Sequence, residues 1–241
     1  MLYTSTRNNK IRVTAAQAIA QGISEEGGLF VPVELPHFSM DTVREMMEMS
    51  YIDRAKTVLR TFLTDFSDEE LNYCVEGAYR ADKFSSPAVA PTVNIGGKEN
   101  ILELWHGPTC AFKDYALQLM PKLLVEAKKM LGRTETTRIL VATSGDTGKA
   151  ALAGYAGLPG IEIEVFYPDA GTSEIQRLQM ATQAGDNVSV YAVNGNFDDA
   201  QTGVKRVFGD ASVAEELEKR NICLSSANSI NWGRLVPQIV Y

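Results

Sequence analysis

The chain has 241 residues and a net charge of -7, and 45% of its residues are apolar and 22% charged. This composition is typical of globular proteins and excludes the disordered and fibrous classes. The negative balance argues against broad nucleic-acid binding, which needs concentrated lysine and arginine. No apolar run approaches the roughly 20 residues that span a bilayer, and the polar N-terminus has no signal-peptide pattern, so the sequence predicts a cytoplasmic protein. The three cysteines and two histidines are too scattered for a disulfide framework or a metal site.

The first ninety residues predict a module of short helices joined by turns, without the alternation of strands and helices that follows. Thr14 is a suitable cap for a helix over residues 15–21. Ser67 and Glu70 have the spacing of a capping box at the start of a second helix. A stretch rich in Ser, Pro and Ala at residues 85–91 then predicts the boundary of this module, which we set at residues 1–90.

From residue 91 to residue 241 the pattern changes to alternating strands and helices. A hairpin is predicted first, with its turn at Gly96 and Gly97. Continuous apolar runs separated by helical patterns follow, which is typical of a parallel sheet covered on both faces and predicts an α/β domain. These runs are Ile139–Ala142, Ile161–Tyr167, Val188–Val193 and Ile222–Leu224. A helical pattern that starts near Asn231 reaches Tyr241 without a stop signal, so we expect a longer protein.

The turn-rich stretch His-Gly-Pro-Thr-Cys-Ala-Phe-Lys-Asp, residues 106–114, puts Lys113 between a strand and a helix. A lysine amine attacks a carbonyl group only when it is neutral, and a partly buried position lowers the pKa of the amine. Lys113 is therefore a candidate for Schiff-base formation. On this context alone a solvated charge in the first helical turn is the commoner case.

A second candidate site is Thr-Ser-Gly-Asp-Thr-Gly, residues 143–148, between a strand and a helix. Glycines let a ligand approach the backbone, and the unpaired N–H groups of a helix start favour a carboxylate or phosphate. The alternative is a simple helix cap by Ser144, Asp146 or Thr147. A P-loop needs glycine at the first of these positions and Ser or Thr where Ala150 stands, so nucleoside triphosphate binding is excluded.

The combination of these two segments with others along the chain resembles threonine synthases, which are fold type II enzymes dependent on pyridoxal 5'-phosphate (PLP). The resemblance implies an α/β protein in which a helical N-terminal module precedes a partial fold type II body with a parallel sheet. Related PLP lyases share the lysine and loop segments in looser form, whereas the N-terminal module and the segment around Asn228 look specific to threonine synthases. The segments are Tyr3–Arg7, Gly27–Pro32, His106–Thr109, Ala111–Asp114, Thr143–Gly148, Asn196–Gln201 and Asn228–Trp232.

Threonine synthases convert O-phospho-L-homoserine and water into L-threonine and phosphate, with PLP as the electron sink. The resemblance implies that Lys113 carries PLP and moves protons among the substrate carbons. Asp146 is implied to lie near the cofactor ring hydroxyl, where related enzymes commonly have Asn. The loop residues implied to bind the substrate carboxylate are Thr143, Ser144, Gly145 and Thr147.

The resemblance further implies that Asn228, Ser229 and Arg234 bind the substrate phosphate. The alternative is a helix start capped by Asn228 or Ser229 beside a solvated arginine. His106 has only its place in the motif to recommend it, and a packing role explains it equally well. A loop for the cofactor phosphate and a partner for the pyridine nitrogen are expected beyond Tyr241, so the isolated chain is expected to be inactive.

Two other interpretations stay open from the sequence. The first is a related PLP lyase, of the Ser/Thr dehydratase type or acting on phosphorylated amino alcohols. The second is a non-catalytic fragment or binding module, in which the lysine and the loop persist but the pocket does not retain PLP. The sequence carries no prediction of the oligomeric state.

Overall fold

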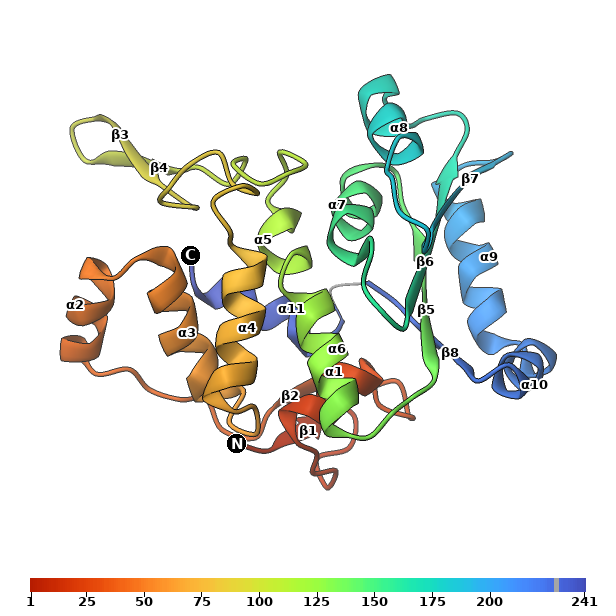
Figure 1. The fold of residues 1–241 in the computed structure, drawn as a ribbon, viewed down its shortest axis with the longest axis horizontal. Helices are drawn as coiled ribbons and strands as arrows, with labels where there is room; N and C mark the ends of the chain where they lie inside the picture. Colours follow the sequence, from red (N-terminus) through yellow and green to blue (C-terminus); the bar gives the residue numbers. More distant parts are fainter. Residues whose placement is uncertain (228–229) are drawn as a thin grey trace. The chain divides into compact units, whose positions relative to one another are not determined.

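The computed structural model describes residues 1–227 and 230–241, which form two compact units. The first unit comprises residues 1–131 together with residues 230–241, and the second comprises residues 132–227. Figure 1 follows both units along the chain by colour. Of the described residues, none lies in a helix with the length and apolar character needed to cross a membrane.

The first unit is mainly helical, and its helix starts agree with the prediction. Thr14 Oγ1 accepts a hydrogen bond of 3.2 Å from the backbone N–H of Gln17, and Ser67 and Glu70 form the predicted capping box. These side chains satisfy N–H groups that have no partner inside a helix. The helices are α1 (Ala15–Gln21), α2 (Met40–Glu48), α3 (Tyr51–Phe62), α4 (Asp68–Ala78), α5 (Lys113–Leu117), α6 (Met120–Met130) and α11 (Trp232–Leu235), followed by a 3₁₀ turn, η1 (Val236–Ile239).

Two short antiparallel strands in this unit were not predicted. They are β1 (Tyr3–Ser5) and β2 (Phe30–Pro32), with Tyr3 opposite Pro32. The pair adds to the predicted helical module and is not part of an alternation of strands and helices. Three residues are too few for a two-residue period to appear in a sequence, so only the pairing between distant segments defines these strands.

The predicted hairpin is present as strands β3 (Thr92–Gly96) and β4 (Glu99–Leu102). All nine strand residues are exposed, and Val93 pairs across the hairpin with Ile101. The hairpin forms a two-stranded sheet of its own. Such a ribbon has little burial to stabilise it.

The core of the first unit joins both ends of the described chain. The Trp232 ring lies 5.4 Å from the Tyr3 ring and 5.7 Å from the Phe62 ring, measured between centroids. Tyr3 Oη donates a hydrogen bond of 2.7 Å to the Phe62 carbonyl. The Asn231 side-chain amide donates to the Ile19 carbonyl at 2.9 Å, at the end of α1. Residues near position 231 therefore complete a core begun at residue 3.

The second unit contains the predicted parallel sheet, in the order β7-β6-β5-β8. Its strands are β5 (Thr136–Ala142), β6 (Ile161–Pro168), β7 (Val188–Val193) and β8 (Ile222–Ser225), which confirms the four apolar runs. Its helices are α7 (Asp146–Tyr155), α8 (Glu174–Ala181), α9 (Phe197–Gly209) and α10 (Ala211–Lys219). Helices α7 and α9 lie on opposite faces of the sheet (Figure 1), so the α/β class is confirmed.

The predicted module boundary at residues 85–91 does not coincide with a limit of the compact units. This segment lies inside the first unit, where Tyr115 Oη donates to the Val89 carbonyl at 2.7 Å and the Ser85 N–H donates to the His106 carbonyl at 2.9 Å. The boundary of the N-terminal module at residue 90, with a second domain from 91 to 241, stays a prediction.

Limited proteolysis distinguishes the two divisions. With a protease of broad specificity, we expect the first cuts at residues 131–134, which are all exposed and connect the units. Residues 85–91 should be cut later because hydrogen bonds hold their backbone. Mass spectrometry of the first fragments is the measurement, and a denatured sample shows which bonds the protease can cut. First cuts within 85–91 would instead support the boundary at residue 90.

Candidate functional site

Lys113 is the first residue of α5, and its side chain is partly buried. Its Nζ atom lies 4.4 Å from the centre of the Phe112 ring, a distance at which the ring attracts a cation. The side chain is thus partly exposed, and the role of Lys113 in Schiff-base formation stays a prediction. The amine stands at the start of a short helix whose other residues, Asp114 to Leu117, are buried.

Asp114 anchors the turn that leads to Lys113. Its side chain has no exposed surface and accepts hydrogen bonds from Thr109, at 2.8 Å from the backbone N–H and 2.7 Å from the hydroxyl. The Cys110 N–H donates to the Gly107 carbonyl at 3.1 Å and closes the turn. Because a buried carboxylate is costly without donors, these contacts tie residues 107–110 to the first turn of α5. The sequence analysis assigned Asp114 no such role.

His106 is held by hydrogen bonds at both ring nitrogens. Its Nε2 atom lies 2.7 Å from a Glu103 carboxylate oxygen, and its Nδ1 atom lies 2.9 Å from the Ser85 hydroxyl. The ring also stacks on Trp105. These contacts give His106 a structural role in joining the segment at residue 85 to the end of the hairpin, and they favour the packing interpretation.

The 143–148 loop connects β5 to α7, and α7 begins without a side-chain cap from its N-cap residue. The N-cap residue is Gly145, which has no side chain, so the alternative of a cap by Ser144, Asp146 or Thr147 is wrong. Instead, the Thr143 hydroxyl oxygen accepts hydrogen bonds from two backbone N–H groups of the loop, each 3.0 Å long. Thr143 is buried and shapes the loop from within, whereas Ser144 and Asp146 are exposed.

The two glycines of the loop are required by close contacts. A Cβ atom at Gly148 would lie 2.9 Å from Met180 Sδ and 3.0 Å from Val165 Cγ1, and would also collide with Thr143. A Cβ atom at Gly145 would collide with the side-chain amide of Gln176. Helix α8, which carries Gln176 and Met180, therefore packs directly on this loop.

Gln176 is a candidate site residue that the sequence analysis missed. Its Nε2 atom donates a hydrogen bond of 2.5 Å to Asp146 Oδ1. The two residues are separated by the rest of α7, strand β6 and a loop, so no local pattern relates them. The one available signal was the Ser173 and Gln176 spacing of a helix start, which predicts a cap for α8 but not its contact with Asp146.

Arg234 lies in α11 and is 7% exposed, so the alternative of a solvated arginine is wrong. Helix α11 is capped by Asn231, whose side-chain oxygen accepts from the Gly233 N–H at 2.8 Å. Asn228 and Ser229 lie outside the described residues. Helix α5, with Lys113, packs against α11, so the structure brings the segments of Lys113 and Arg234 together in the first unit. The 143–148 loop belongs to the second unit.

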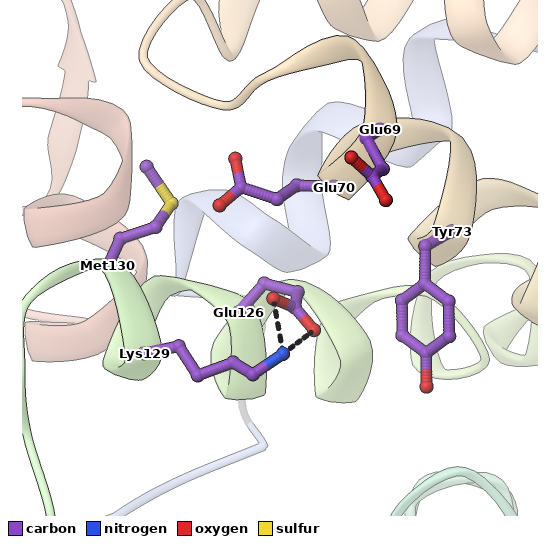
Figure 2. A pocket seen from close by; sticks show the side chains of 6 residues that line it. All are labelled: Glu69, Glu70, Tyr73, Glu126, Lys129 and Met130. Carbon is purple, nitrogen blue, oxygen red and sulfur yellow. Dashed lines mark hydrogen bonds and ion pairs between the residues drawn. The ribbon is translucent and has the colours of Figure 1, made fainter.

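A hollow of about 460 Å³ between α4 and α6 contains none of the predicted site residues (Figure 2). Glu126 and Lys129, both on α6, form an ion pair of 3.0 Å on one wall of the hollow, and hydrogen bonds from Ser67 lower the pKa of Glu70. These carboxylates serve structural contacts. The lining residues are Glu69, Glu70, Tyr73, Glu126, Lys129 and Met130. No cluster of three His, Cys, Asp or Glu residues that could hold a metal occurs within residues 1–227 and 230–241.

A second lysine of the first unit has an unusual environment. Burial, followed by the charges of Lys122 and Arg80, lowers the pKa of Lys83 to about 8. Its Nζ atom donates a hydrogen bond of 2.6 Å to Gln118 Oε1. A fraction of this amine is neutral near physiological pH, so Lys83 is the natural competitor of Lys113 for an aldehyde.

The Asp114 anchor predicts a stability effect at Thr109. Thr109→Val removes the hydroxyl donor from a buried carboxylate and should lower the free energy of unfolding by about 1–3 kcal/mol, whereas Thr109→Ser keeps the donor and should stay near the unchanged protein. Both tryptophans, Trp105 and Trp232, lie in the first unit, so their fluorescence during urea unfolding reports on this unit. The exposed Thr134→Val is the control. An equal decrease in the free energy of unfolding in both Thr109 variants would contradict the role of the hydroxyl.

Comparison with known proteins relates this geometry to a family. Residues 2–79 match the family described as the threonine synthase N terminus. Along its whole length the chain is 38% identical to the threonine synthases of Pseudomonas aeruginosa and Escherichia coli, and covers 50% and 52% of them. The chain thus spans about half the length of the curated relatives that it matches.

Solved structures agree with the sequence comparison. A PLP-bound threonine synthase from Brucella melitensis matches the whole chain with a TM-score of 0.91 at 36% identity, and the yeast threonine synthase matches it with 0.89 at 34%. The chain covers 50% and 48% of those two proteins. Residues 2–79 are therefore similar to the threonine synthase N terminus, and the whole chain is similar in sequence and fold to about half the length of these threonine synthases.

Proposed function

We propose that this chain supplies the PLP-bearing lysine and the carboxylate-binding loop of a threonine synthase. The reaction is the conversion of O-phospho-L-homoserine and water into L-threonine and inorganic phosphate. The observation that carries the proposal is the similarity of the entire chain, in sequence and in fold, to a PLP-bound threonine synthase. Because the chain spans half of its relatives, the activity proposed is that of a longer protein. The cytoplasmic location stays a prediction.

The residues of the first unit fit PLP by their chemistry. An aldehyde needs a primary amine, and Lys113 offers one at a partly buried helix start that Asp114 anchors. When bound, PLP would supply the electron sink for carbanions. In this proposal the Lys113 amine holds the cofactor, and after the substrate displaces it, the same amine accepts and returns protons at the substrate carbons. Arg234, with Asn228 and Ser229, is proposed to bind the substrate phosphate.

The second unit fits the substrate carboxylate. The first turn of α7 directs backbone N–H groups out of the helix, and Gly145 carries no side chain to cover them. In this proposal the 143–148 loop binds the carboxylate through Ser144, Gly145 and Thr147, with Thr143 shaping the loop behind them. Asp146 is proposed to accept a hydrogen bond from the cofactor ring hydroxyl, because an ionised carboxylate can only accept.

Cofactor attachment is tested by reduction. After incubation of the chain with PLP at pH 7, borohydride fixes the cofactor on the lysine that carries it, and peptide mapping identifies that lysine. We expect the label on Lys113 and its loss in Lys113→Arg. Lys83→Arg is the matched control, since the Lys83 amine, whose pKa is lowered to about 8, is the competitor for the aldehyde in the first unit. Label on Lys83, Lys122 or Lys149, with no label on Lys113, would refute the assignment.

Turnover is tested by phosphate release from O-phospho-L-homoserine with excess PLP. A complete threonine synthase such as the Escherichia coli relative is the positive control. The 241-residue chain should release phosphate only at the background rate of its own Lys113→Ala variant. Each charge-assisted hydrogen bond that a cofactor phosphate lacks weakens binding by about 1.5–3 kcal/mol, so an incomplete site binds PLP poorly.

Turnover by the unmodified chain at the rate of the complete enzyme would contradict the expected inactivity. Formation of a keto acid from serine or threonine, without phosphate release from the phosphorylated substrate, would favour a dehydratase-type lyase instead.

A further inference from the structure

We propose that Gln176 is a positioning residue for the 143–148 loop. Its side-chain amide holds the Asp146 carboxylate toward α8, and the first turn of α7 is thereby left to a ligand carboxylate. Gln176 lies outside every segment that carries the resemblance to threonine synthases. The assignment of the ligand rests on the proposed function, whereas the contact between Gln176 and Asp146 does not.

Hydrogen bonds fix the orientation of the Gln176 amide. Its Oε1 atom accepts from the Ser173 hydroxyl at 3.0 Å, and its Nε2 atom donates to Asp146 Oδ1 at 2.5 Å. An ionised carboxylate can only accept, so the amide nitrogen must face Asp146. The Ser173 oxygen also accepts from the Gln176 backbone N–H at 3.3 Å, which anchors the residue in the first turn of α8.

Gln176 also packs on the loop. Its amide lies against Gly145, where a Cβ atom would collide with it. One helical turn later, buried Met180 lies against Gly148. Residues four apart lie on the same helical face, so a single face of α8 contacts both glycines of the loop. The position of Gln176 is therefore set by the same helix that fixes the loop.

The contact matters because Asp146 is itself an anion at a helix start. A carboxylate in the first turn is attracted to the positive end of the helix, which would also attract a ligand carboxylate. Gln176 gives Asp146 a donor on the neighbouring helix. An amide does this without neutralising the charge, so Asp146 remains an acceptor.

The test exchanges the hydrogen-bond donor and acceptor between Gln176 and Asp146. Gln176→Glu keeps an acceptor for Ser173, so the cap of α8 survives, but it puts a second carboxylate beside Asp146. The double variant Asp146→Asn with Gln176→Glu restores the hydrogen bond with its direction reversed. Gln179→Glu makes the same chemical change on the same helix and is the matched control. Thermal unfolding of each variant verifies that α8 remains folded.

The first readout needs no ligand. The backbone amide NMR signals of Gly145 and Gly148 in the 241-residue chain should shift in Gln176→Glu, return in the double variant and stay in place in Gln179→Glu. The inference would be overturned, whatever the chain binds, if the Gly145 and Gly148 signals did not shift in Gln176→Glu. It would also be overturned if they did not return to their original positions in a folded double variant.

The second readout is the affinity for O-phospho-L-homoserine, compared with 3-aminopropyl phosphate, which lacks the carboxylate. Gln176→Glu should weaken the first about tenfold and leave the second unchanged, and the double variant should recover most of the loss. Equal weakening of both probes, or of neither, would overturn the link to the ligand carboxylate. If the unchanged chain binds neither probe while the amide signals respond as expected, the assignment of a ligand carboxylate to this loop in the 241-residue chain fails, whereas the positioning of Asp146 stands.

Discussion

At Gly148, helix α7 packs closely against side chains of a strand, a loop and a second helix. Without a Cβ atom the Gly148 backbone can approach Val165 and Met180, and its N–H can reach the Thr143 hydroxyl. That approach sets where α8 lies on the loop, and with it the place of the Gln176 amide. The shape of the loop and the direction of the Asp146 carboxylate thus both depend on having glycine, which has no Cβ atom, at position 148.

In the segment before Lys113, a charged side chain holds the tight turn next to the helix start. In both segments a side-chain oxygen accepts N–H groups of a tight turn next to a helix start: the Thr143 hydroxyl in one and the Asp114 carboxylate in the other. A neutral hydroxyl is inexpensive to bury, whereas a carboxylate must recover its lost hydration through strong hydrogen bonds. The second device is more rigid, and it stands beside the residue that is proposed to form a covalent bond.

The sequence was sufficient for features that depend on neighbouring residues. The four apolar runs became the parallel strands, and Thr14 and Ser67 became the caps, because periodicity and capping act within a few residues. Features that depend on distant residues were missed. The role of Gln176 arises from a contact across 30 positions, and the burial of Arg234 arises from packing around α11. The β1 and β2 pair likewise exists only through contact between distant segments.

The first unit is assembled from both ends of the described chain, since Asn231 binds the carbonyl of Ile19 and Trp232 packs on Tyr3. During synthesis on the ribosome, residues 1–131 emerge long before the segment that completes their core. The second unit has all its strands by residue 225 and can fold while its neighbour still exposes the rings of Tyr3 and Phe62. Asn231 and Trp232 are synthesised after all four described strands of the second unit, so the first unit can close this part of its core only after those strands have emerged.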